Sequence, residues 1–145
     1  MENIKFRVWD KDDEEMREVE NIHVGGNRKQ VAVWNEENDC CEWVYNYELM
    51  QYTGFKDMNG KEIYEGDILK DVLESKNGEK RIYYNEIFYS DGCFQVRDLD
   101  NSINFLFEYA HKGVVYMEVV GNVYENPELI KKRRRCEDVF KLWNE

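Results

Sequence analysis

Residues 49–70 read LMQYTGFKDMNGKEIYEGDILK and contain the turn signals that decide the fold. The pair Asn59-Gly60 suits a left-handed turn, because both residue types tolerate positive φ. A second glycine, Gly66, precedes a strand pattern that resumes at Ile68. We therefore interpret this stretch as a turn-and-strand module with a structural role and not as a catalytic site.

The acidic residues of this module have two other interpretations. Asp67 and its neighbour Glu65 could belong to a catalytic or metal-binding element, but no second motif supplies carboxylates at a suggestive spacing. Residues 57–60 slightly resemble the start of a calcium loop, but Gly66 stands where the loop needs its glutamate. We expect structural roles here and at the end of the folded region for Tyr52, Gly54, Asp57, Gly60, Ile63, Gly66, Asp67, Gly121, Asn122, Asn126 and Pro127.

Alternating apolar residues on both sides of the module predict a mainly β protein. In residues 1–52 the alternation around Phe6, Val33 and Tyr45 indicates a small antiparallel sheet, the N-terminal β region. Residues 53–66 form a connecting turn segment. Five short strands separated by turn signals in residues 67–125 predict an SH3-like β-barrel.

Residues 126–145 are predicted to form one amphipathic α-helix. Asn126 is a good N-cap, and Pro127 suits the first helical position. Apolar residues then recur at helical spacing up to Trp143. The same segment contains an unbroken basic run, which is a candidate interaction site: Lys131, Lys132, Arg133, Arg134 and Arg135.

The chain has a formal net charge of −11, which makes nucleic acid an improbable partner. The basic run is the local exception. It could bind nucleic acid or anionic lipid. It could dock on an acidic protein surface, including the surface of another copy of this protein. It could also be the solvated face of a helix. Five consecutive residues wrap most of the way round a helix, which favours the solvated or intramolecular alternative.

The cysteines do not predict a metal site or disulfides. Cys40, Cys41, Cys93 and Cys136 include no C-x-x-C pair, and the sequence has only 2 histidines. We expect reduced thiols in a cytoplasmic protein, with no metal and no cofactor. No signal peptide and no membrane-spanning run is present in the sequence.

No catalytic motif is recognisable, and we expect a protein that is not an enzyme. The sequence lacks the glycine patterns of dinucleotide and phosphate loops and lacks a G-x-S-x-G motif. The aromatic residues of the first half could stack on bases or on a nucleotide. In sheets such residues more often pack across strands, which we favour for Trp9, Trp34, Trp43, Tyr45 and Tyr47.

Four segments together resemble the YopX family of phage and prophage proteins. They are IKFRVWDK (4–11), LMQYTGFKDMNGKEIYEGDILK (49–70), YSDGCFQV (89–96) and EVVGNVYENPEL (118–129). The resemblance runs from about Ile4 to Leu129 in the family's segment order. It implies a phage or prophage origin, a mostly β fold with an SH3-like second half, and an oligomer of identical chains as one option. It implies no activity, and it does not extend to the basic run.

Two functions remain open at this point. The first is a non-enzymatic phage or prophage accessory protein in the host cytoplasm that binds a host or phage protein through its acidic body. The second is an oligomeric protein that binds a small molecule, such as a nucleotide signal of host defence. The strong acidity without a catalytic constellation favours the first.

Overall fold

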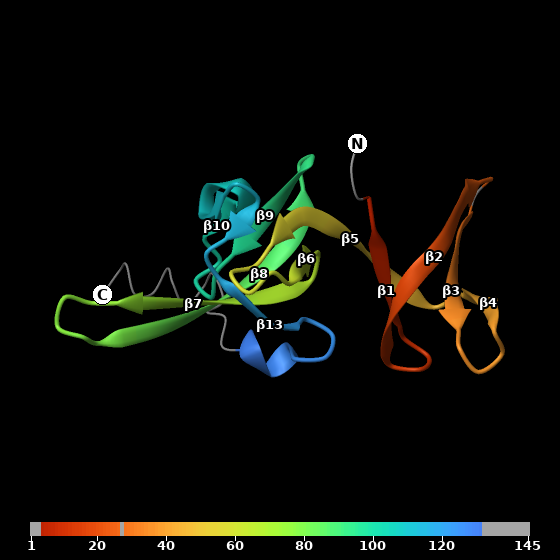
Figure 1. Ribbon diagram of the computed structural model, residues 1–145, viewed down its shortest axis with the longest axis horizontal. Helices are drawn as coiled ribbons and strands as arrows, with labels where there is room; N and C mark the ends of the chain where they lie inside the picture. Colours follow the sequence, from red (N-terminus) through yellow and green to blue (C-terminus); the bar gives the residue numbers. More distant parts are fainter. Residues whose placement is uncertain (1–3, 27, 132–145) are drawn as a thin grey trace, which may run out of the picture. The chain divides into compact units, whose positions relative to one another are not determined.

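The computed structural model describes residues 4–26 and 28–131, and it divides into two compact units between Tyr52 and Thr53. We call these the N-terminal unit and the C-terminal unit and describe each by itself. Strand β5 (Tyr47–Lys56) begins before the division and ends after it (Figure 1).

The N-terminal unit is one antiparallel sheet in the order β5-β1-β2-β3-β4. Its other strands are β1 (Phe6–Asp10), β2 (Glu15–Gly25), β3 (Arg28–Asn35) and β4 (Cys40–Val44). Side chains alternate between the two faces of each strand, so that one face gathers the buried Val8, Val31, Val33 and Val44. The phenol of Tyr47 on β5 donates a hydrogen bond to the carbonyl of Lys29 on β3, at 3.0 Å, and so joins two strands that are not neighbours.

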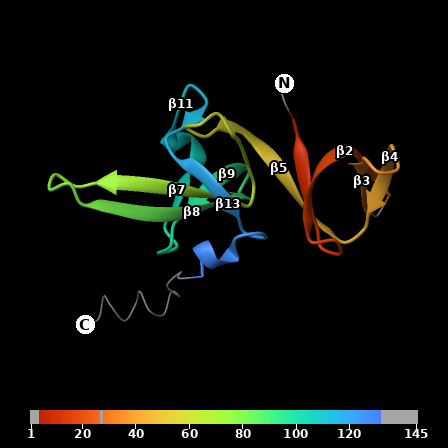
Figure 2. The ribbon, with the colours of Figure 1, turned by 60° about the horizontal axis from the view of Figure 1, so that its bottom comes forward.

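The C-terminal unit contains a five-stranded antiparallel sheet in the order β10-β9-β8-β7-β13 (Figure 2). Its elements are β6 (Glu62–Tyr64), β7 (Asp67–Glu74), β8 (Lys80–Ser90), β9 (Cys93–Arg97), β10 (Ile103–Phe105), the 3-10 helix η1 (Leu106–Tyr109), β11 (Ala110–His111), β12 (Val114–Val115), β13 (Glu118–Asn122) and the 3-10 helix η2 (Pro127–Leu129). Strands β6 and β12 pair with the end of β5.

The hydrophobic core of the C-terminal unit draws residues from nearly every element. Its buried members are Ile63, Leu69, Ile87, Val96, Leu106, Val115, Met117 and Val119. Leu106 lies in η1 and is fully buried, so this short helix covers one end of the core. The mainly β fold predicted from the sequence is confirmed.

The carboxylate of Asp57 links the connecting segment to the last strand of the sheet. Asp57 is 1% exposed and accepts three backbone hydrogen bonds. Oδ1 accepts from the amides of Asn59 at 2.9 Å and Lys61 at 2.8 Å, and Oδ2 accepts from the amide of Val119 at 2.9 Å. A buried carboxylate is stable only with such partners, so this residue fixes the local turn and its docking on β13 together.

Three glycines of the same segment adopt backbone conformations that other residues avoid. Gly54, Gly60 and Gly66 have φ of 84°, 83° and 81°. Gly66 also joins distant strands, because its amide donates to the carbonyl of Ile87 at 2.7 Å and its carbonyl accepts from the amide of Val123 at 2.8 Å. The left-handed conformation presents both groups to neighbouring segments without a side-chain clash.

Several other residues of the stretch 49–70 are buried. Ile63 is 0% exposed and belongs to the core, and Tyr52 is 6% exposed. Asp67 is 1% exposed, and its Oδ2 accepts a hydrogen bond from the amide of Tyr64 at 2.8 Å. The hydroxyl of Thr53 donates to the carbonyl of Ile63 at 2.7 Å, which ties β5 to β6.

A compact asparagine loop follows β13. The Oδ1 of Asn122 accepts from the amides of Tyr124 and Glu125, and the Oδ1 of Asn126 accepts from the amide of Asn122 at 3.3 Å. The register of β13 against β7 shifts between Val119 and Gly121, which is a β-bulge. A Cβ on Gly121 would lie 2.3 Å from the Oδ1 of Asn126, so glycine is needed for close approach.

The SH3-like β-barrel predicted for residues 67–125 is not confirmed, because the described residues form no closed barrel. Among the described residues, β10 and β13 are the edges of the five-stranded sheet and no pairing joins them. The pattern around residues 103–109 explains the difference, since only Ile103–Phe105 continues as a strand. The chain then turns into η1, and Leu106 enters the core where a continued edge strand would have been needed.

The start of the predicted C-terminal helix also differs from the expectation. Pro127–Leu129 is a 3-10 turn, and Asn126 makes no side-chain capping hydrogen bond. Its side chain instead bonds to the amide of Asn122, which competes with the cap. The rest of the predicted helix, with Lys132 to Arg135 and Cys136, lies outside the described residues.

Replacing Asp57 by Asn should destabilise the C-terminal unit by roughly 2–4 kcal/mol, because the substitution removes the buried charge and can place an amide donor against the amide of Val119. Hydrogen–deuterium exchange of β7, β8 and β13 in urea measures the loss. The exposed Asp91, at φ 54°, provides the matched control Asp91→Asn, which should be neutral. Equal stability of the two variants would contradict the role of Asp57.

Replacing Gly121 by Ala should destabilise the same unit by about 1–3 kcal/mol, since the new Cβ would overlap the side chain of Asn126. Thermal unfolding of Gly121→Ala and of the double variant with Asn126→Gly tests the cause. The double variant should lose less than the two single losses added together. Strict additivity would show that the side chain of Asn126 is not the obstacle.

Candidate functional site

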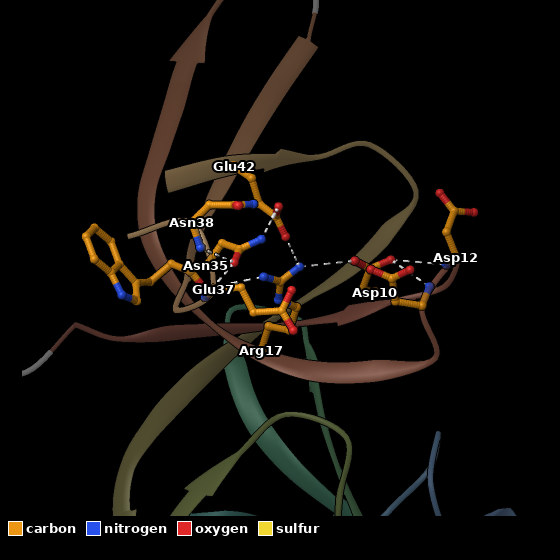
Figure 3. A network of polar contacts seen from close by, with 9 residues as sticks. Asp10, Asp12, Arg17, Asn35, Glu37, Asn38 and Glu42 are labelled. Carbon is orange, nitrogen blue, oxygen red and sulfur yellow. Dashed lines mark hydrogen bonds and ion pairs between the residues drawn. The ribbon is translucent and has the colours of Figure 1, made fainter. Parts of the chain in front are cut away.

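The candidate site is a polar network around Arg17 in the N-terminal unit (Figure 3). The strand registers place Arg17 beside Val8 and Glu42 beside Val33. Val8 and Val33 belong to the apolar core, and cross-strand partners lie on the same face of a sheet. The network therefore continues the core face of the sheet where the apolar residues end.

The guanidinium of Arg17 joins β2 to the three strands β1, β3 and β4. Its Nη1 lies 2.5 Å from Oε1 of Glu42 and 3.7 Å from Oδ2 of Asp10, and its Nη2 donates to the carbonyl of Trp34 at 3.3 Å. The side chain of Arg17 is 13% exposed, and that of Asp10 is 7% exposed. A planar guanidinium with several fixed donors suits this role better than an ammonium group.

Two neighbouring turns are built from the same network. The Oδ1 of Asp10 accepts from the amides of Asp12 at 3.1 Å and Asp13 at 3.2 Å. The Oδ1 of Asn35 accepts from the amides of residues 37 and 38, while its Nδ2 donates to Oε2 of Glu42 at 2.7 Å. Asp10 and Asn35 each hold one loop in place and also contact the charged centre directly or through Glu42 (Figure 3).

The contacts of the network shift two pKa values. The pKa of Glu42 is lowered, first by the hydrogen bond from Asn35 and then by the hydrogen bond from Arg17. Burial lowers the pKa of Arg17, but the hydrogen bond and charge of Glu42, with the charges of Glu15 and Asp10, outweigh it and raise that pKa. At neutral pH Glu42 is therefore an ionised acceptor.

A hollow of about 640 Å³ lies over this network and is strongly acidic. Arg17 is the one cationic side chain among its lining residues, and Trp34 contributes an exposed ring at 44%. Most of the lining side chains end in carboxylates: Asp13, Glu15, Glu18, Glu20, Glu36, Glu37 and Glu42. We call this hollow the acidic groove.

The acidic groove was not predicted from the sequence. Its residues come from the first hairpin and from the β3–β4 loop, and only the register of three strands brings them together. The acidic run at residues 12–15 and the pair Glu36-Glu37 were the available signals. Neither signal contains the spacing that a recognised motif would have.

Of the interaction residues proposed from the sequence, only Lys131 is within the described part of the chain. Lys131 is exposed at the end of the described chain, and Lys132, Arg133, Arg134 and Arg135 lie outside the described residues. The turn and core residues of 52–67 and 121–127 have the structural positions given above and do not line the acidic groove.

The aromatic residues of the N-terminal unit divide into two groups. Tyr47 packs against the core, whereas Trp34, Trp43 and Tyr45 are 44%, 49% and 82% exposed. Trp43, Tyr45 and Tyr47 border a smaller hollow with Lys29, Gln30 and Val44. The structure does not stack these rings into one platform for bases.

The described residues present no ready metal site or membrane helix. Among residues 4–26 and 28–131, no three His, Cys, Asp or Glu side chains are grouped so that they could hold an ion. Cys40, Cys41 and Cys93 are free thiols. No helix in this part of the chain is both long and apolar enough to cross a membrane.

Comparisons with known proteins place the chain in a family. The family model described as YopX protein matches residues 5–131, so the chain belongs to the YopX family. The solved structure titled protein EF1440 from Enterococcus faecalis is similar, with 29% sequence identity and a TM-score of 0.59. The similarity covers 89% of this chain and 99% of that one. No curated protein matches the sequence.

Replacing Glu42 by Gln should make the N-terminal unit less sensitive to acid. Because the folded-state pKa of Glu42 is below the ordinary 4.5, its contribution to stability is present above that pH and is lost as the pH falls through the folded-state value. The difference in Tm between wild type and variant should therefore be largest near neutral pH and narrow below pH 4.5.

Thermal unfolding between neutral and acid pH measures this difference. Glu20→Gln is the matched control, because it removes an exposed carboxylate from the same groove without touching Arg17. Profiles of Glu42→Gln and wild type that stay parallel at every pH would contradict the assigned contacts.

Proposed function

We propose that this protein is a non-enzymatic accessory protein that binds a basic surface of a host or phage protein through the acidic groove. The observation that carries the proposal is that seven carboxylates line the groove around one guanidinium, that of Arg17, which is already paired with Glu42. A groove of this kind attracts cationic side chains and speeds their encounter.

The groove keeps its negative charge available for a partner. Glu42 and Asp10 are occupied by Arg17, which fixes the strands beneath the groove. Within the described residues, the side chains of Glu18, Glu20 and Glu36 make no ion pair and are exposed. They can therefore accept Lys and Arg side chains of a partner without first breaking contacts of their own.

The state of Glu42 favours recognition over proton transfer. General acid–base catalysis works best with a group whose pKa lies near the working pH. The pKa of Glu42 is shifted downward, away from neutral pH. An ionised carboxylate held by Asn35 and Arg17 is suited to attract cations and to hold the groove in shape.

A phage or prophage origin and action in the host cytoplasm are part of the proposal. Membership of the YopX family supports them, together with the segments that carry the resemblance. The alternative, binding of a nucleotide signal, receives no support from the groove, since its carboxylates would repel phosphate groups.

Affinity purification of the full chain from infected cells tests the proposal. We expect the wild type to retain a basic protein that elutes as salt rises, because salt screens exposed charges. The triple variant Glu18→Gln, Glu20→Gln, Glu36→Gln should retain much less of this protein, because it removes three carboxylates of the groove. Its fold should be kept, because Arg17 and Glu42 stay intact.

A matched control removes equal charge from exposed positions of the C-terminal unit: Glu79→Gln, Asp91→Asn and Glu108→Gln. The control should bind like wild type. Retention of the same partner by the groove variant, with unchanged salt dependence, would contradict the proposal. So would release of a nucleotide from the denatured wild type without any retained protein.

A further inference from the structure

The hairpin of β7 and β8 extends beyond the sheet to which it belongs. Figures 1 and 2 both show it projecting from the rest of the C-terminal unit. The pairing of β7 with β13 ends at Lys70, and the pairing of β8 with β9 begins at Glu86. Among the described residues, 71–74 and 80–83 therefore pair only with each other. We call residues 71–83 the arm.

The arm exposes apolar side chains to solvent on both of its faces. Val72 and Ile82 face each other across the ladder and are 44% and 52% exposed. Leu73, on the opposite face, is 54% exposed. Two-stranded ribbons are marginally stable in water, and clustered exposed apolar residues commonly mark a surface that a partner covers.

The charges around the apolar pair point to the kind of partner. Glu74 and Lys80 pair with each other two positions along the ladder from Val72 and Ile82. Because side chains alternate between faces, both pairs lie on the same face of the ribbon. Both are exposed, and they form no ion pair within the described chain. One ribbon face thus carries an apolar centre with a carboxylate and an ammonium beside it.

Such a face is complementary to itself. If a two-fold axis passes near Val72 and Ile82, the Glu74 of one copy meets Lys80 of the other, and the reverse contact forms by symmetry. The arm also contains both charge signs equally, so two arms can approach although the chain has a net charge of −11. Its charged residues are Asp71, Glu74, Lys76, Glu79, Lys80 and Arg81.

We infer that the arm is the contact surface for a second copy of this chain. The two arms pack with their Val72–Ile82 faces together, related by a two-fold axis, and exchange Glu74–Lys80 ion pairs. This surface lies in the C-terminal unit, and it shares no residue with the acidic groove. Self-association through the arm can therefore be tested separately from partner binding.

Light scattering of the full chain over a range of concentrations gives the first test. The wild type should exceed the monomer mass of 17.6 kDa as concentration rises. Val72→Glu and Ile82→Glu should weaken association at least about tenfold, the effect of losing a central apolar contact. Val24→Glu, at a site that is 75% exposed in the N-terminal unit, should leave it unchanged.

A charge-reversal mixture gives a second test that does not depend on the apolar variants folding well. Glu74→Lys and Lys80→Glu should each weaken self-association, because like charges then meet across the axis. An equimolar mixture of the two variants should regain wild-type association, since each copy supplies the charge that the other needs. An effect confined to one chain would not be repaired by mixing.

Three results would overturn the inference. They are a wild type that stays monomeric at every concentration, association of Val72→Glu and Ile82→Glu equal to wild type, and failure of the mixture to regain association. Loss of association in the acidic-groove variant Glu18→Gln, Glu20→Gln, Glu36→Gln would also count against it, because that change leaves the arm intact.

Discussion

The buried carboxylate of Asp57 is the constraint on which the C-terminal unit depends. Its two oxygens bind amides of its own turn and the amide of Val119, which is 62 residues away in the chain. Hydrogen bonds to a charged acceptor contribute about 1.5–3 kcal/mol each, and loss of the acceptor would leave buried amides without a partner. Closing the turn and docking β13 are therefore one event. The glycine at 66 adds a second tie, to β8 and to the residue after β13.

The N-terminal unit uses a different solution for the same problem of joining strands. The side chain of Arg17 joins four strands, and its contacts with Asp10, Trp34 and Glu42 replace the apolar packing that stops at Val8 and Val33. Partly buried ion pairs of this type hold strands in register more than they add net stability. Because the guanidinium of Arg17 is already paired with Asp10 and Glu42, the other carboxylates give the groove a strong negative field. The same contacts of Arg17 therefore join the strands of this unit and leave the groove negatively charged.

The features that could be predicted from the sequence are those set by neighbouring residues in the chain. The turns at Gly60 and Gly66 and the alternating strands follow from residue preferences that act over a few positions. The SH3-like β-barrel was not confirmed, because whether residues 106–109 continue as a strand depends on whether Leu106 fills the core, which is a tertiary effect. The α-helical start at Pro127 was wrong because the side chain of Asn126 bonds backward to Asn122 and not forward. The acidic groove needed strand registers that spacing alone does not reveal.

The family-defining segment and the candidate interaction surface are thus different parts of the molecule. Residues 49–70 hold strands together, whereas the groove is the surface that we propose binds a partner. Hydrogen–deuterium exchange of the full chain, alone and in complex with a basic protein recovered from infected cells, tests this separation most directly. We expect added protection at residues 13–20 and 34–42 and none that is centred on residues 57–67. Protection centred on 57–67, with the groove unchanged, would contradict it.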